Sequence, residues 1–289
     1  MNTPPPAHPP VPGLLLRLAG PLQSWGEHSH FNDRDTLAFP TRSAITGLLA
    51  AALGRPRHQP PGDLADISLT VRVDRPGIRL RDFHTVGGGL SGPRSVITAE
   101  GTRRSPETST LTSTRWYLAD AAFTIALTRP DHTPPPTTWI QALHTPRWPL
   151  YLGRRSCPPA GPLLLGHSTH ALHDLIHLPL AAPAPHTEHP DHQTVPVLFL
   201  SDQPLTALPT PDRPPHKDAG QEHSTVLDDP LDFTPTHRRY RARPLYRRTL
   251  TLPTDRCHGY GTRQLHALAA YTSSTYTPAR PTLPERSPR

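Results

Sequence analysis

The sequence predicts a protein of the α+β class. Three observations point to this class: a short apolar run at 13–18, a helical pattern at 42–53, and alternating β-branched segments further along the chain. With 289 residues the chain can bury a sizeable core, and we expect two domains. The 41 prolines cluster in a few stretches, which indicates linkers and surface loops between ordered segments.

The first elements are expected to be a strand, a polar loop and a helix. The run at 13–18 (GLLLRL) has the size of a central strand. In the helical pattern, apolar residues recur at spacings of three and four, so they share one face. Thr41 can cap the N-terminus of this helix, and Gly54 stands where a helix-ending glycine belongs. The loop at 20–43 need not contribute its polar residues to the core.

Further strands follow from alternating patterns. Residues 67–77 and 78–86 are separated by a Pro-Gly turn, which predicts a β-hairpin. Residues 115–127 form another alternating segment. The order β-α-β-β with a later strand suits a ferredoxin-like or RRM-like (RNA-recognition-motif-like) sheet that has its helices on one face. We assign this N-terminal domain to residues 13–130.

An insertion and a second half complete the predicted organisation. Residues 87–114 contain almost no residues of buried type, which predicts a projecting arm that engages a ligand, with idle disorder as the alternative. The second half shows one short helix and two strands, at 138–144, 195–202 and 239–253. We therefore expect a small β-rich C-terminal domain at 131–253 and a flexible tail at 254–289.

The charge of the chain is compatible with a nucleic-acid partner. The formal net charge is +7, and Lys217 is the single lysine among 30 basic residues. Guanidinium groups stack on bases and form paired hydrogen bonds with phosphates. A GC-rich genome would also produce many arginines, so charge does not decide the function.

Cysteine usage and hydropathy indicate a cytoplasmic protein without a membrane partner. Cys157 and Cys257 are the two cysteines, and the proline-rich start at 1–12 does not look like a signal peptide. No apolar run reaches the roughly 18 residues of a membrane span.

Motifs for several classes of chemistry are missing. On a helix, His170, His173 and His177 would share one face, but no Asp, Glu or Cys framework surrounds them, so we predict no metal or cofactor. The sequence has no Gly-x-Ser-x-Gly motif and no Walker-type or dinucleotide-type glycine loop. Serine-hydrolase and nucleotide-hydrolase functions are therefore unsupported.

A basic turn at 150–159 (LYLGRRSCPP, from Leu150) is the best remaining candidate for ligand contact. Its glycine lets the backbone approach a ligand, and Arg154 and Arg155 offer guanidinium donors to phosphates. The alternative is that this basic turn is exposed to solvent and contacts no ligand. Three basic or aromatic loops from separated segments can converge on one groove that holds a single strand of nucleic acid.

Four segments in the same order and spacing resemble one protein family over roughly residues 13–166. The family is that of the CasD subunits of the type I-E CRISPR interference complex, Cascade. The segments are LLLRLAGPLQSWG with RDTLAFPTRSAITGLLAAALG, LRDFHTVGGG, RWYLADAAFTIAL and PLYLGRRSCPP. Beyond about residue 167 the resemblance fades.

The resemblance implies a non-catalytic RNA-binding subunit in antiviral defence. Such a subunit has an RRM-like N-terminal domain with a protruding β-hairpin thumb, here 87–114, and a smaller C-terminal domain. It holds the repeat-derived 5′ handle of the guide RNA (crRNA), packs on a backbone subunit and contacts the large subunit, and it reaches target DNA only through the complex. The sheet lacks the aromatic signature of sequence-reading RNA-recognition motifs, so loops and thumb should bind the RNA.

The candidate RNA-binding residues come from these loops and strands. Trp25 can stack on a base, plug a subunit contact or pack in the core; Arg42 and Ser43, at the start of the first helix, can hold a phosphate. The full set is Trp25, Arg34, Arg42, Ser43, His84, Arg103, Arg104, Arg115, Arg154 and Arg155.

Two other functions stay open. One is a metal-independent endoribonuclease that processes CRISPR repeat RNA, in which His84, Tyr117 and Arg115 would serve as base, acid and charge stabiliser. The other is a free-standing RNA-recognition protein, which predicts a stable monomer that binds RNA tightly by itself.

Overall fold

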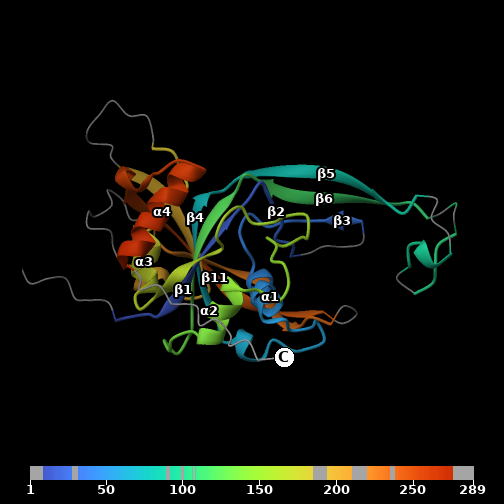
Figure 1. The fold of residues 1–289 in the computed structure, drawn as a ribbon, viewed down its shortest axis with the longest axis horizontal. Helices are drawn as coiled ribbons and strands as arrows, with labels where there is room; N and C mark the ends of the chain where they lie inside the picture. Colours follow the sequence, from blue (N-terminus) through green and yellow to red (C-terminus); the bar gives the residue numbers. More distant parts are fainter. Residues whose placement is uncertain are drawn as a thin grey trace, which may run out of the picture.

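A computed structural model of the chain has two connected sheets flanked by helices, so the α+β class is confirmed (Figure 1). It describes residues 9–27, 32–88, 92–98, 101–105, 107, 109–184, 194–209, 220–234 and 238–275. Within these ranges no helix is long and apolar enough to cross a membrane.

The larger sheet has seven strands in the order β10-β11-β9-β4-β7-β1-β8, and every neighbouring pair is antiparallel. Its strands are β1 (Gly13–Ala19), β4 (Ser68–Arg75), β7 (Ala122–Thr128), β8 (Leu164–Ser168), β9 (Thr194–Ser201), β10 (Glu222–Asp232) and β11 (Arg239–Pro253). Strand β1 is buried along its whole length, as expected of a central strand.

The smaller sheet is organised around β6 (Leu111–Ala119). Strand β5 (Ile78–Val86) pairs with β6 over its full length, and the short β2 (Leu22–Gln23) and β3 (Asp33–Arg34) also pair with β6. The β5-β6 hairpin projects from the body, and the segment between its strands lies at the far end (Figure 1). A 3-10 turn, η2 (Gly92–Arg94), belongs to this tip.

The expected hairpin between 67–77 and 78–86 is wrong. Strand β4 pairs with β7 and β9, whereas β5 pairs with β6 in the other sheet. The Pro-Gly turn redirects the chain instead of reversing it: Gly77 has φ +73°, and a Cβ there would lie 2.7 Å from the Ala119 carbonyl oxygen. The projecting hairpin therefore extends beyond the predicted arm at 87–114, because β5 precedes the arm and β6 begins within it and continues past it.

Helix α1 (Arg42–Leu53) matches the predicted bounds and caps. The Thr41 side chain accepts a hydrogen bond from the Ala44 N–H at 3.2 Å, and Gly54 has the left-handed φ of +73°. Helix α2 (Thr137–His144) also forms where the sequence predicts a helix. The predicted strand at 115–127 is divided between β6 and β7.

Helices cover both faces of the large sheet, not one face as expected. Helices α1 and α2 pack with alternate β1 residues such as Leu14 and Leu16 in one apolar cluster. Helices α3 (Ala171–His177) and α4 (Thr262–Thr275) pack with Leu15 in a second cluster. On this second face the fully buried Arg72 donates to the carbonyl oxygens of α3 residue Leu175 and of Leu178.

The second half of the chain extends the same sheet. Strands β9, β10 and β11 continue it through the pairing of β9 with β4, so the expected domain at 131–253 is not a separate sheet. Residues 254–275, within the expected flexible tail, form η5 (Thr254–Arg256) and α4, because Leu268 of α4 is buried in the second cluster. Residues 276–289 lie outside the described part.

Two further 3-10 turns are η1 (Gly62–Ala65) and η4 (Leu205–Ala207).

Candidate nucleic-acid interface

Three strands at the base of the hairpin bring basic side chains to one face. Arg115 on β6 lies opposite Asp82 on β5 in the antiparallel register, and opposite Arg34 on β3 in the parallel register. Directly opposed residues project from the same face of a sheet. His84 and Tyr117 lie two positions further along β5 and β6, so they share this face, which we call the Arg115 face (Asp82, His84, Arg115, Tyr117).

The basic turn packs against this region. The Leu152 carbonyl oxygen accepts from the Ser24 N–H at 3.1 Å, which places the turn beside β2. Gly153 has φ +90°, and a Cβ there would lie 1.8 Å from the Ser24 carbonyl oxygen. The glycine therefore permits a close contact within the protein, which differs from its predicted role of admitting a ligand.

Arg154 connects the turn to the Arg115 face. Its Nη2 donates to the carbonyl oxygens of Arg34 at 3.0 Å and Asp35 at 3.3 Å. Its guanidinium carbon lies 4.9 Å from the centroid of the Tyr117 ring, within cation-π range. Nη1 is buried and has no hydrogen-bond partner in the described part of the chain. Arg155 is exposed in the same turn.

A short polar chain runs beside these arginines. His84 Nε2 lies 2.6 Å from Asp82 Oδ2 and 3.5 Å from the Tyr117 hydroxyl, which is 3.5 Å from Ser156 Oγ. Arg115 Nε donates to Ser113 Oγ at 3.2 Å. Donors and acceptors for phosphates and ribose hydroxyls therefore gather on one face.

The thiol beside the turn is not set up as a nucleophile. Cys157 is fully buried, and burial raises the pKa of its thiol, although the hydrogen bond with Ser156 and the charge of Arg154 oppose this. A raised pKa leaves little thiolate near neutral pH.

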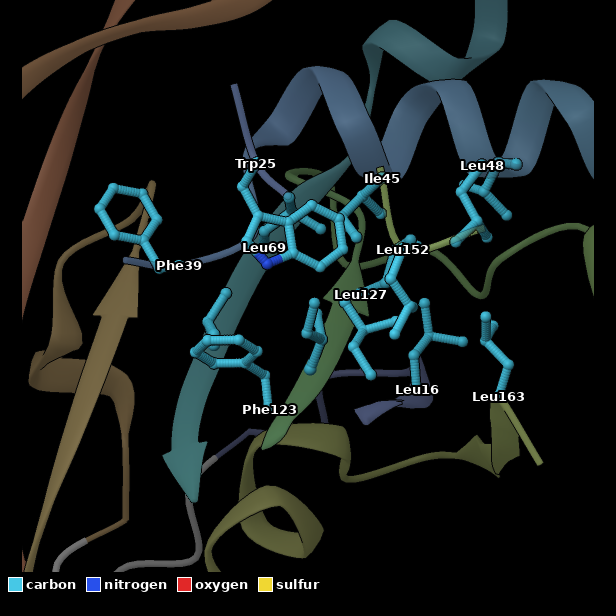
Figure 2. Packing of buried hydrophobic residues seen from close by; sticks show 14 of the residues in the cluster. Leu16, Trp25, Phe39, Ile45, Leu48, Leu69, Phe123, Leu127, Leu152 and Leu163 are labelled. Carbon is cyan, nitrogen blue, oxygen red and sulfur yellow. The ribbon is translucent and has the colours of Figure 1, made fainter. Parts of the chain in front are cut away.

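Trp25 is part of the core and has no surface available for base stacking. Its side chain is 1% exposed, and Figure 2 shows the indole among labelled core residues beneath α1. Its Nε1 donates to Gln23 Oε1 at 3.2 Å. Of the predicted alternatives, the structure places Trp25 in core packing.

Arg42 and Ser43 do not form the predicted phosphate site. The Arg42 side chain donates to Asp229 Oδ1 at 2.9 Å and to Asp202 Oδ2 at 2.6 Å, deep in the protein. The Arg42 backbone N–H, at the start of α1, donates to Asp228 Oδ2 at 2.7 Å. An internal carboxylate therefore occupies the anion position at this helix end. The Ser43 hydroxyl shares a 3.2 Å hydrogen bond with Thr41 Oγ1.

Arg103 and Arg104 belong to the tip of the hairpin, away from the basic turn. Arg103 Nη1 donates to the Pro93 and Ser95 carbonyl oxygens at 2.7 and 3.1 Å. The Arg104 N–H donates to the Val96 carbonyl oxygen at 3.0 Å. The structure thus brings together Arg34, His84, Arg115, Arg154 and Arg155, and it separates the other predicted residues from them.

Asp82 and Ser156 were missed by the sequence reasoning. Asp82 stands two positions before His84, and the alternation of a strand would have placed both on one face. The contact of Ser156 with Tyr117 depends on the fold of the turn, and no local pattern predicts it. Among the described residues, no group of three His, Cys, Asp or Glu side chains could hold a metal ion.

Comparisons with known proteins identify the family of the chain. The family model described as "CRISPR-associated protein (Cas_Cas5)" matches residues 13–246. The Escherichia coli (strain K12) protein "CRISPR system Cascade subunit CasD" is 39% identical over 165 residues, which cover 53% of this chain and 70% of that protein.

Two solved structures are similar over most of the chain. One, described as "CRISPR RNA-guided surveillance complex", has a TM-score of 0.71 and 39% identity, and the match covers 90% of this chain and 99% of that one. Another, "Crystal structure of Cas protein", has a TM-score of 0.50 and 30% identity, with 86% and 99% covered. The chain therefore belongs to the Cas5 family of CRISPR-associated proteins.

Proposed function

We propose that this protein is a non-catalytic, cytoplasmic subunit of a type I-E Cascade surveillance complex, where it holds the repeat-derived 5′ handle of the crRNA. Its partners would be the backbone subunit and the large subunit, and target DNA would be reached through the complex. The similarity to a Cascade subunit and to a chain of an RNA-guided complex supports this assignment.

One observation carries the RNA-binding role. Three segments far apart in sequence place Arg34, Arg115 and Arg154 around the base of one hairpin. Such a cluster, with Arg155 and His84 beside it, matches the charge and hydrogen-bonding pattern of a sugar-phosphate backbone. Arg103 and Arg104 would contact the RNA further along, at the hairpin tip.

The strand order supports a ferredoxin-like or RRM-like core. Strands β8-β1-β7-β4 are neighbours in this order, α1 connects β1 to β4, and α2 connects β7 to β8. We infer from this order a β-α-β-β-α-β unit of the ferredoxin-like type, with the β5-β6 hairpin inserted between β4 and β7. Because α3 and α4 cover its second face, RNA contact through the hairpin and the basic turn is favoured over contact through the sheet.

Charge reversal in the basic turn tests the assignment. The complex would be co-expressed with Arg154→Glu and Arg155→Glu together, and the RNA that co-purifies would be measured on a denaturing gel. We expect the variant to lose handle-bearing RNA. Arg57→Glu, an exposed arginine near η1, makes the same type of charge change as a control and should retain RNA. Full RNA retention by the double variant would reject the role of the turn.

The endoribonuclease alternative keeps one supporting observation. His84 lies within 3.5 Å of the Tyr117 hydroxyl and 2.6 Å from Asp82, and Arg115 is on the same face. In such a site a base would remove the proton of a ribose 2′-OH, which would attack the adjacent phosphate and release a 5′-hydroxyl strand from a 2′,3′-cyclic phosphate. Incubation of the purified protein with repeat RNA in EDTA tests this. Specific cleavage that His84→Ala abolishes would favour the nuclease over the non-catalytic subunit.

A further inference from the structure

The two faces of the β5-β6 hairpin differ in their side chains. In the antiparallel register Arg81 lies opposite Trp116 and Phe83 lies opposite Thr114, so these residues share the face that is opposite to the Arg115 face. We call it the Phe83 face. Its members are Arg79, Arg81, Phe83, Thr85, Thr112, Thr114, Trp116 and Leu118. None of these eight residues carries a carboxylate, and the acidic residue that adjoins this face is Asp33 on β3, which pairs with Thr114.

On the Phe83 face the Phe83 ring is accessible, the Trp116 ring is partly buried, and cations lie beside both. The Phe83 side chain is 69% exposed, although it is a large apolar residue. The guanidinium carbon of Arg79 lies 5.5 Å from the centroid of the Trp116 ring, and Arg79 Nη2 donates to the Thr36 carbonyl oxygen at 2.8 Å. This hydrogen bond fixes one cation beside the indole. Arg81 is exposed next to both rings.

The chemistry of this face fits an unpaired polynucleotide. Bases present flat π faces that stack on aromatic rings, and the phosphates between them pair with guanidinium groups. A purely apolar protein partner would leave Arg79 and Arg81 without counter-charges in the contact, which is costly. Threonine hydroxyls along both strands add donors and acceptors for phosphates and ribose 2′-hydroxyls.

The hairpin also lets one strand of RNA reach both faces. Within the described residues, β5 pairs with β6 alone, so its other edge is open. The hairpin is two strands wide where it projects, and Figure 1 shows it extending clear of the body. A chain bound at Arg115 on one face can therefore continue around the β5 edge to Phe83.

We propose that the Phe83 face is a second contact surface for the same RNA: unpaired bases stack on Phe83 and Trp116, and Arg81 pairs with a phosphate between them. This proposal rests on the proposed function, because it requires RNA at the Arg115 face.

The test uses the full-length chain and a fluorescein-labelled single-stranded RNA with the CRISPR repeat sequence. Phe83→Ala and Arg81→Ala are titrated beside Arg57→Ala, an exposed arginine near η1 that belongs to neither face of the hairpin. Loss of a stacking contact should weaken binding by about fivefold or more, and Phe83→Tyr should restore it because the ring is kept. Arg57→Ala should bind nearly as the unchanged protein does. RNA containing 4-thiouridine should crosslink to the peptide that carries Phe83.

The outcomes separate this proposal from the proposed function. One outcome is that the unchanged protein binds the RNA and that Arg155→Glu weakens this binding whereas Phe83→Ala does not. The Phe83 face is then not an RNA surface, but the subunit role stands. If Phe83→Ala binds RNA normally yet fails to enter the co-expressed complex, the face contacts protein and the proposal is overturned. If the unchanged protein binds no RNA either alone or in the complex, both proposals fail.

Discussion

The guanidinium of Arg154 lies 4.9 Å above the Tyr117 ring while its Nη2 holds the carbonyl oxygens of Arg34 and Asp35. One side chain thereby connects the basic turn, β6 and the segment around β3. Because these three segments carry the basic residues of the candidate interface, Arg154 both shapes the site and contributes to its charge.

Arg154 and Arg155 should therefore respond differently to truncation. Arg154→Ala removes two hydrogen bonds and a ring contact, so we expect the free energy of unfolding to fall by roughly 1 kcal/mol. Arg155→Ala should change it by less than about 0.5 kcal/mol. Both variants should lower RNA affinity. Urea unfolding and RNA titration measure the two effects, and equal destabilisation by the two variants would contradict the structural difference.

Gly153 should not tolerate a side chain. Alanine at this position would combine a φ of +90° with a Cβ 1.8 Å from the Ser24 carbonyl oxygen, so the turn must move. We expect Gly153→Ala to reduce the free energy of unfolding by about 1–3 kcal/mol and to weaken RNA binding.

Gly47 in α1 supplies the matched control. Among the described residues, no atom apart from the backbone of the same helix lies within 4 Å of a Cβ built there, so Gly47→Ala should stabilise the helix by about 0.5–1 kcal/mol. Thermal unfolding of both variants checks the pair. A stabilised Gly153→Ala would mean that the turn does not adopt this conformation.

Arg42 should be essential for stability and not for RNA contact. Arg42→Ala leaves the buried Asp202 without its ion-pair partner, although Asp229 keeps its pair with Arg241, and we expect this to cost about 3–5 kcal/mol. Arg55→Ala breaks the exposed pair with Asp63 and should cost less than about 1 kcal/mol. Denaturant titration compares the two. A similar small loss in both variants would argue against the buried ion network.

Asp63 should make a small contribution to acid sensitivity. The hydrogen bond from Arg55 lowers the pKa of the Asp63 carboxyl, with a further contribution from Trp139 Nε1. A carboxyl group whose pKa is lowered in the folded state stabilises the protein at pH values above the ordinary aspartate pKa of about 4. This stabilisation is lost as the pH falls through the lowered pKa.

Asp63→Asn should therefore be less stable than the unchanged protein at neutral pH, by less than about 1 kcal/mol because the carboxylate is half-exposed. The difference should vanish in acid. Melting temperatures measured across the acid range test this, and a difference that stays constant with pH would show that the charge of Asp63 is not its cause.

Helices and strands whose sequence patterns span only a few neighbouring residues were predicted well. Helix α1, with Thr41 and Gly54 as its caps, formed with the expected bounds because spacing and caps are local properties. Strand β5 was recognised as a strand but was given the wrong partner, since its pairing with β6 joins segments separated by the whole hairpin tip.

The candidate site was predicted in part for the same reason. Arg34, from the loop at 20–43, and Arg154, from the basic turn, lie around Arg115, whereas Arg103 and Arg104 of the third loop, at 87–114, lie at the hairpin tip. Arg42 looked equally suitable for a phosphate, but its carboxylate partners Asp202 and Asp229 are 160 and 187 positions further along the chain. Trp25 was an open choice between surface and core until its packing was known.

The sequence by itself determined the residue chemistry, the family resemblance and the local elements, because each depends on neighbouring residues and their order. Only the tertiary structure decided which arginines are buried among carboxylates and which remain available to a ligand. The physical reason is that desolvation and ion pairing depend on groups brought together from distant parts of the chain.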